Sequence, residues 1–243
     1  MKEKQITMTQ RLSEISSSRK AEARLSLIGN FGTVIGAEIF NAICLLIGYQ
    51  IIAGISLGTS LWNFIGGEIA VFIVTTFMGI FTFGLYFILM SLAYDQKPVF
   101  RDLFRGFRKE NSDRVVKMEA VLAAIELACM LPAQIVSFVA GSNTVLIIVL
   151  YAAGIVLSCY VGLTFAMGVV LLIDFPDMMS TEALRTSANM MKGNKGKLLY
   201  IELSFIPLYL LGIISCGIAD LWVYAYNQMT VTSFYHYLAS EKK

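Results

Sequence analysis

Long apolar segments separated by short polar connections run along most of this chain. Most of them reach the roughly 20 residues that a helix needs to cross a hydrocarbon core about 30 Å thick. They occupy residues 27–56, 66–94, 115–140, 144–173, 197–217 and 220–239. This pattern predicts an all-α, polytopic membrane protein in which six transmembrane helices form three hairpins.

Composition supports the membrane class. Hydrophobic residues make up 57% of the chain and charged residues only 15%, with a mean hydropathy of +0.70. A soluble core this apolar would need far more charged surface around it. We therefore expect a single membrane domain over residues 1–243, in contact with the lipid bilayer.

The positions of the basic residues predict the orientation. Six of the 19 lysines and arginines lie in the N-terminal arm, seven in residues 95–117, four in 174–197 and two at the C-terminus. The connections at 57–65, 140–144 and 216–220 contain none. Since basic loops stay on the cytoplasmic side, both termini are expected to be cytoplasmic. The net charge of +2 follows this topology and gives no indication of nucleic-acid binding.

One motif occurs twice, 164 positions apart, and places a glutamate inside an apolar segment each time. The first copy is Gly29-Asn30-Phe31-Gly32 followed by Glu38, and the second is Gly193-Asn194-Lys195-Gly196 followed by Glu202. A fainter copy, Asn111 followed by Glu119, falls between them. This spacing predicts a pseudo-threefold internal repeat with units of about 1–95, 96–174 and 175–243.

The glycine and asparagine of the motif have a structural use. Gly29 and Gly193 would end one helix, and the side chains of Asn30 and Asn194 would cap the next. Capping matters more in lipid than in water, because an unpaired N–H group in lipid costs several kcal/mol.

An amphipathic helix precedes each hairpin in this scheme, and the clearest one lies before residue 110. Its aromatic face carries Phe100, Phe104 and Phe107 at helical spacing, and its basic face carries Arg101, Arg105 and Arg108. Such a helix is typical of the headgroup plane of a bilayer. The alternative is a docking surface for a cytoplasmic partner.

The three glutamates carry the main functional hypothesis. Eight residues of helix rise about 12 Å, so each acid would lie within the inner leaflet. Asn41 shares a helical face with Glu38, and Glu126 shares one with Glu119. A ring of carboxylates could bind a cation or line a polar passage. Alternatively, the acids form interhelical hydrogen bonds, or the helices begin later and the acids contact water.

The last apolar segment is polar for a membrane span. Tyr226 and Thr230 fall on one face of it, together with Ser233. A helix like this must be shielded from lipid by its neighbours or must line water.

Motifs for catalysis or metal binding are missing from the sequence. His236 is the only histidine, and the four cysteines show no Cys-X-X-Cys spacing. There is no His-Glu-X-X-His, no Gly-X-Ser-X-Gly and no phosphate-binding loop. We therefore expect a protein that is not an enzyme and that uses no metal or cofactor.

Several stretches resemble a known family. They are Met190-Met191-Lys192-Gly193-Asn194-Lys195, Leu203-Ser204-Phe205-Ile206, Cys216-Gly217-Ile218 and Leu25…Gly29-Asn30-Phe31-Gly32. They are similar to the bacterial domain-of-unknown-function family 975 of integral membrane proteins. Pro207 and Ala225 depart from the family pattern. The resemblance implies the bacterial cytoplasmic membrane and brings no established activity.

Two functions therefore remain open at this point. The first is a non-enzymatic membrane protein that binds or passes a small solute, cation or lipid through a polar interior. The second is the permease subunit of an exporter, or an envelope accessory or scaffold protein, that acts through a cytoplasmic or membrane partner. The sequence leaves the oligomeric state undetermined.

Overall fold

The structure is a computed structural model that describes residues 8–139, 144–215 and 217–240, and these residues form helices without strands. The helices are α1 (Met8–Leu27), α2 (Phe31–Ser56), α3 (Leu61–Ala93), η1 (Phe100–Phe107), α4 (Lys109–Val139), α5 (Thr144–Phe165), α6 (Gly168–Asp174), α7 (Ser180–Met190), α8 (Lys195–Leu203), α9 (Ile206–Ile214) and α10 (Ile218–Ser240). The prediction of an all-α protein is confirmed.

Five helical stretches among the described residues are long and apolar enough to cross a membrane. They are α2, α3, α4, the stretch Thr144–Asp174 that contains α5 and α6, and the stretch Lys195–Ile214 that contains α8 and α9. Their outward faces are apolar: Ile43, Ile47 and Ile51 recur every fourth residue on α2, and Ile47 is 56% exposed. A continuous exposed aliphatic stripe is expected where a helix faces lipid.

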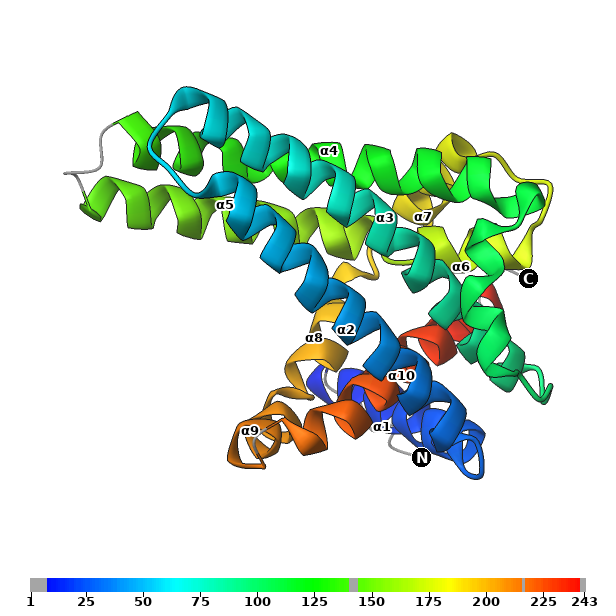
Figure 1. The fold of residues 1–243 in the computed structure, drawn as a ribbon. Helices are drawn as coiled ribbons and strands as arrows, with labels where there is room; N and C mark the ends of the chain where they lie inside the picture. The colour runs from blue at the N-terminus through cyan, green and yellow to red at the C-terminus, as the bar shows by residue number, and fades with distance from the viewer. Residues whose placement is uncertain (1–7, 140–143, 216, 241–243) are drawn as a thin grey trace.

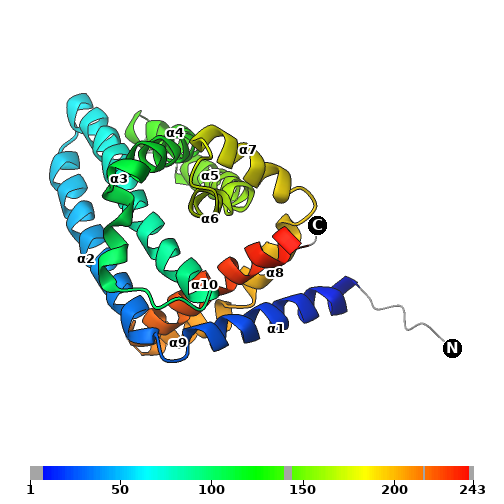
Figure 2. The same ribbon diagram turned by 90° about the vertical axis from the view of Figure 1, so that its right-hand side faces the viewer.

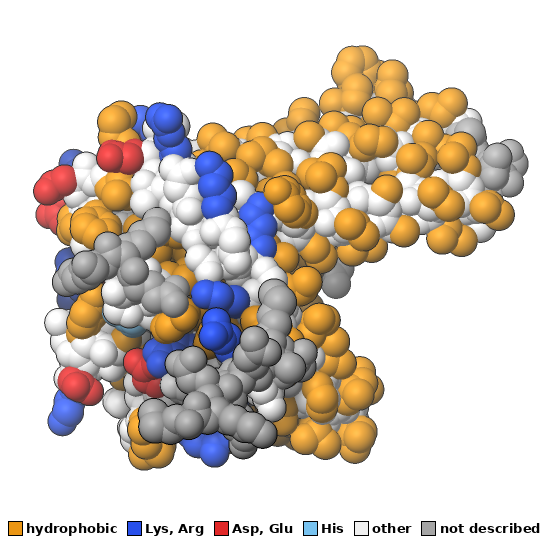
Figure 3. All heavy atoms as spheres, turned by 180° about the vertical axis from the view of Figure 1, so that it is seen from behind, with side chains coloured by type: hydrophobic (Ala, Val, Ile, Leu, Met, Phe, Trp, Pro, Cys, Tyr) orange, Lys and Arg blue, Asp and Glu red, His pale blue; other side chains and the backbone are white. Residues whose placement is uncertain are grey.

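Charged and apolar surfaces are segregated. Figure 3 shows two projecting parts covered with hydrophobic side chains, while lysines and arginines gather over the region from which these parts extend. This distribution fits a protein whose projecting helices lie in a bilayer and whose basic side faces the headgroups.

Helix α3 is the centre of the packing. It contacts α2, α4, η1, α6 and α10, and Figure 1 shows α3 running between the α4–α5 pair and α2. On the other side of the molecule α1 lies along α10, as Figure 2 shows. The α2–α3 and α4–α5 pairs are antiparallel neighbours, as expected for helices joined by short connections.

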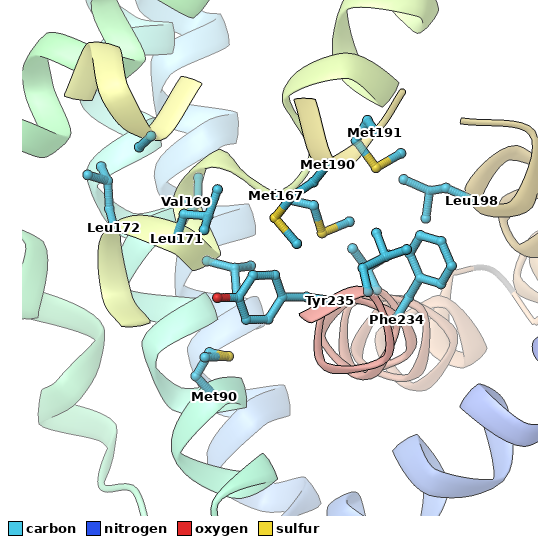
Figure 4. Packing of buried hydrophobic residues seen from close by; sticks show 14 of the residues in the cluster. Met90, Met167, Val169, Leu171, Leu172, Met190, Met191, Leu198, Phe234 and Tyr235 are labelled. Carbon is cyan, nitrogen blue, oxygen red and sulfur yellow. The ribbon is translucent and has the colours of Figure 1, made fainter. Parts of the chain in front are cut away.

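A methionine-rich core joins α10 to the other helices. Phe234 and Tyr235 of α10 are almost fully buried; Tyr235 lies between Met90 of α3 and Met167, while Phe234 lies toward Leu198 of α8 (Figure 4). Methionine side chains adapt to irregular gaps between crossing helices, so this core fixes the C-terminal half of α10 inside the protein.

The Asp174 carboxylate ties three helix ends together. It accepts a hydrogen bond of 3.0 Å from the Tyr94 hydroxyl, just after α3, and one of 2.6 Å from the Tyr235 hydroxyl of α10. Burial, with the hydrogen bond and the charge of Asp174, raises the pKa of Tyr94.

The amphipathic segment before α4 is a 3₁₀ helix, η1, and not the α-helix that its spacing suggested. Its aromatic face packs on α2 and α3: the ring centroids of Phe104 and Phe40 are 5.4 Å apart, and those of Phe107 and Phe81 are 5.1 Å apart. The phenylalanines therefore dock on protein as well as facing outward, while Arg101 and Arg108 remain exposed.

The motif glycines behave as expected, but the asparagines do not. Gly29 and Gly193 adopt positive φ angles of 85° and 78° at the ends of α1 and α7. The predicted side-chain caps are wrong: Asn30 makes no capping hydrogen bond, and Asn194 Nδ2 donates backwards to the carbonyl of Met190 at 3.0 Å. The amide thus completes the end of α7, where carbonyl groups lack helical partners.

The middle copy of the motif differs from the other two. Asn111 lies inside the first turn of α4, where its Nδ2 donates to the carbonyl of Arg105 at 3.3 Å and its Oδ1 accepts from Arg114 at 2.9 Å. No glycine breaks the helix there, so the described structure shows two matching copies of this turn and not three.

Close approach of η1 to α3 depends on Gly84, and we predict that Gly84→Ala destabilises the protein. A Cβ atom at this position would overlap the carbonyl of Leu103, a backbone group that cannot rotate away. Overpacking of this kind costs about 1–3 kcal/mol. Thermal unfolding in detergent should show a clearly lower midpoint for Gly84→Ala. Gly54→Ala on α2, where a Cβ atom would meet nothing within 4 Å, is the matched control; equal midpoints for the two variants would contradict this packing.

Candidate functional site

Glu38 is the most isolated acid of the candidate site. It lies eight residues into α2 and is 5% exposed, and neither carboxylate oxygen has a hydrogen-bond partner among the residues that the structure describes. It lines a cavity of about 410 Å³ between α2, α9 and α10. The other lining residues are Asn41, Ala42, Leu45, Tyr209, Asp220, Leu221 and Tyr224.

Two further side chains leave oxygens unpaired at this cavity. Within the described part of the chain, Asn41 Oδ1 and Asp220 Oδ1 are both buried without a hydrogen-bond partner. Unpaired polar groups are uncommon in protein interiors, because each costs about 1–3 kcal/mol and charged groups cost more. Three unsatisfied side chains around one cavity therefore form a place where a polar or cationic guest would be stabilised.

Glu202, by contrast, has protein partners. Asn227 of α10 donates from Nδ2 to Glu202 Oε2 at 2.8 Å and to the Tyr209 hydroxyl oxygen at 3.1 Å. Asn227 is buried, so these bonds join α8, α9 and α10 in an apolar setting. The structure places Glu202 in the hydrogen-bonding arrangement considered from the sequence.

A break separates α8 from α9 directly after Glu202. Pro207 lacks an N–H group, so the carbonyl of Leu203 has no helical donor. The next carbonyl, that of Ser204, accepts a hydrogen bond of 3.2 Å from Lys20 Nζ of α1. The Lys20 ammonium also lies 4.2 Å from the centroid of the Phe205 ring, and burial lowers its pKa. Helix α1 thus holds a cation at the negative end of α8.

Glu119 and Glu126 of α4 line a second cavity of about 260 Å³, together with Tyr86 of α3 and Ser158 of α5. Glu119 Oε1 is buried without a partner. Glu126 also borders a neighbouring cavity of about 370 Å³ between α2, α3 and α4.

Tyr86 connects the two polar regions. Its hydroxyl donates to Gln228 Oε1 of α10, and Tyr86 lines the same cavity as Glu119. Tyr209 lines the cavity of Glu38 and accepts a hydrogen bond from Asn227, which also donates to Glu202. Each of the three glutamates is thus linked to a tyrosine, but Glu38 and Glu119 line different cavities. A single ring of carboxylates around one cavity is therefore wrong.

The structure also separates Tyr226 and Thr230 from the cavity of Glu38. Thr230 Oγ1 donates to the carbonyl of Tyr226 at 2.7 Å, within α10 itself. The Tyr226 ring packs against Phe205, with centroids 5.1 Å apart, and lies 5.8 Å from the Arg24 guanidinium. These two residues stabilise α10 and its packing.

Sequence reasoning missed several residues that line the polar regions. Tyr86 and Tyr209 lie within apolar segments and carry no periodic signal of their own. Asp220 was not among the candidate site residues, yet its Oδ1 is buried against Gly212. The three-residue spacing of Glu38 and Asn41 correctly predicted that they share a helical face, since both line the same cavity.

Apolar helices of spanning length around buried acids define a multi-pass helical membrane protein. The chain belongs to the family described as protein of unknown function (DUF975), whose model matches residues 16–242. Comparisons with curated proteins and with solved structures give no match.

The Asn227 contacts predict a measurable stability effect. Asn227→Leu removes both hydrogen bonds and leaves Glu202 Oε2 without its donor, so the free energy of unfolding should fall by about 1–2 kcal/mol. Thr232→Val on the same helix is the control, because the Thr232 hydroxyl donates to the carbonyl of Gln228 in its own helix. Denaturation in detergent micelles compares the two variants; if Asn227→Leu were as stable as Thr232→Val, the contacts would contribute nothing.

Proposed function

We propose that this protein binds a small solute, with a cation as the first candidate, in the cavity between α2, α9 and α10, and passes it through its polar interior. The observation that carries the proposal is the unpaired carboxylate of Glu38 at this cavity. A carboxylate in an apolar helix bundle is costly and is usually functional. No lysine or arginine is among the described residues that line the cavity, so the missing partner would come from outside the chain.

The contrast with Glu202 supports this assignment. Both acids occupy the same position in the repeated motif, yet Glu202 is bonded to Asn227 and Glu38 has no such donor. A purely structural role explains Glu202 well. It does not explain why Glu38 remains buried and unpaired.

The proposal includes the topology. Helix α10 has 23 residues and would rise about 34 Å, enough for a sixth crossing, with neighbouring helices covering part of its polar surface. The crossings would then form three hairpins, α2–α3, α4–α5 and α8/α9–α10, repeated around a pseudo-threefold arrangement. Both termini would be cytoplasmic, in a bacterial cytoplasmic membrane.

A second candidate is the permease subunit or envelope scaffold that acts through a cytoplasmic partner. The exposed Arg101 of η1 and the exposed Arg108 directly after it favour this candidate, because the aromatic face of η1 is already packed on α2 and α3. In this alternative η1 presents its basic face to an acidic surface of the partner. Neither candidate involves catalysis by this chain.

Hydrophobic carbodiimide labelling tests the Glu38 site. Such reagents modify carboxyl groups in apolar surroundings, so Glu38 should be the main modified residue when the full chain in proteoliposomes is analysed by peptide mass spectrometry. Sodium, potassium or ammonium salts should protect it at millimolar concentration, because a bound cation and the reagent compete for one carboxylate.

Two variants control this experiment. Glu38→Gln should remove the modification and also alter cation flux into the vesicles, while Glu202→Gln should leave labelling of Glu38 in place. An absence of Glu38 labelling in folded protein, or labelling that no cation reduces, would contradict the proposed site.

Reporter fusions test the topology. Alkaline phosphatase inserted after Gly58 should be active, because the α2–α3 turn is expected outside, whereas the same enzyme fused after Lys243 should be inactive. A green fluorescent protein fusion after Lys243 should fluoresce, since it folds in the cytoplasm. The opposite result at the C-terminus would indicate five crossings.

A further inference from the structure

The cavity beside Glu38 is lined by amide, aromatic and aliphatic side chains as well as by two acids. Together these side chains indicate a chemical class of ligand. The argument rests on the proposed function, because it assumes that the cavity has an occupant. Its volume of about 410 Å³ lies in the range of sites that hold small molecules. A bare monovalent ion would fill only a small part of this space.

The polar part of the lining consists mainly of oxygen acceptors that need a donor or a cation. Glu38 contributes two unpaired oxygens, and Asn41 and Asp220 contribute one each. Glu38 is more than nine-tenths buried, so bulk water does not satisfy its carboxylate. A positive charge with N–H or polarised C–H groups would match this set of acceptors.

The donor set suits a hard metal ion less well. Divalent metal ions of the calcium and magnesium type take six or more oxygen ligands, mainly carboxylates, carbonyl groups and water, whereas the described lining of this cavity offers two carboxylates, one amide and the hydroxyl groups of two tyrosines. Among all the residues that the structure describes, no three acidic, histidine or cysteine side chains lie close enough together to hold a metal ion.

The remaining lining is aromatic and aliphatic. Tyr209 and Tyr224 border the cavity, and Leu45, Leu221 and Ala42 complete it. Tyrosine ring faces attract cations, and quaternary ammonium groups are typical ligands of such aromatic sites. Aliphatic side chains at the same cavity would contact the alkyl groups of such an ion.

We propose that this cavity binds a small organic ammonium ion, that is, a monovalent cation carrying alkyl groups around its charge, in preference to a bare metal ion. The carboxylates of Glu38 and Asp220 hold the charge, Asn41 Oδ1 accepts from any N–H group, and the tyrosine rings and leucines enclose the alkyl part.

Competition against carbodiimide labelling of Glu38 tests this ligand class with defined probes. Tetramethylammonium, tetraethylammonium, sodium and potassium chlorides are compared at equal ionic strength, with the purified full chain in nanodiscs. In the wild-type protein a tetraalkylammonium ion should half-protect Glu38 at a concentration at least tenfold lower than sodium or potassium. This comparison needs no variant, so it stands even if a substitution prevents folding.

Variants then test the aromatic part of the site. Tyr224→Leu should raise the half-protecting concentration of tetraalkylammonium about threefold or more while leaving that of sodium unchanged, and Tyr224→Phe should keep the wild-type value because the ring face remains. Tyr49→Leu is the control, since Tyr49 of α2 lines a different cavity.

The outcomes separate the ligand class from the proposed function. If sodium or potassium protects Glu38 as well as tetraalkylammonium does, or if Tyr224→Leu has no effect, the ammonium inference is overturned while the cation site stands. If no cation protects Glu38 at all, both fail.

Discussion

The high cost of an unpaired charge inside an apolar helix bundle is the constraint on which the rest of the structure depends. In lipid, backbone groups are satisfied within helices, and side-chain polar groups must find partners on neighbouring helices. This chain follows the rule at most positions: Asn227 bonds Glu202, Tyr86 bonds Gln228, and Thr230 bonds its own helix. Glu38 is an exception in which both carboxylate oxygens are buried without a partner among the described residues, and the arrangement of α2, α9 and α10 maintains it.

The helices that do not resemble membrane spans provide the support for this arrangement. Helix α1 lies along α10, and its Lys20 donates to the free carbonyl of Ser204 at the break between α8 and α9. Glu22 of α1 accepts a hydrogen bond of 2.6 Å from Ser233 of α10. These contacts fix α10 and the break between α8 and α9 to α1, so that α10 is packed between α1 and the α8–α9 segment.

Much of the fold follows from hydropathy alone, because long apolar runs have few alternatives to helices in a membrane. The apolar segment 66–94 predicted α3, but the helix begins five residues earlier, at Leu61. Residues Leu61–Ile65 lie between the Ser60 cap and the predicted segment. The helix ends near Gly29 and Gly193 also followed from the motif, and both glycines adopt positive φ there. The helix breaks did not follow from hydropathy. Helix α5 ends before Met167 because Ser187 Oγ accepts a hydrogen bond from the Met167 N–H group and donates one to the Thr164 carbonyl.

The site was predictable only where its residues share a helix. Glu38 and Asn41 stand three positions apart, and the sequence paired them correctly. The sequence did not reveal that Tyr209 and Asp220 would line the same cavity from the opposite side. The position of Tyr209 depends on the bend at Pro207, and that of Asp220 depends on the turn after α9. It also suggested equal roles for Glu38, Glu119 and Glu202, although their surroundings differ. Depth in the membrane depends on helix length, whereas the identity of the neighbours depends on crossing angles that hydropathy does not encode.

An electron cryo-microscopy map of the full chain in lipid nanodiscs, at a resolution that shows ordered ions and water, tests the central claim most directly. The account predicts ordered non-protein density within hydrogen-bonding distance of the Glu38 carboxylate, bordered by Asn41, Asp220 and Tyr224. A Glu38 side chain that is bonded to another protein group, or that points into the surrounding lipid, would contradict it.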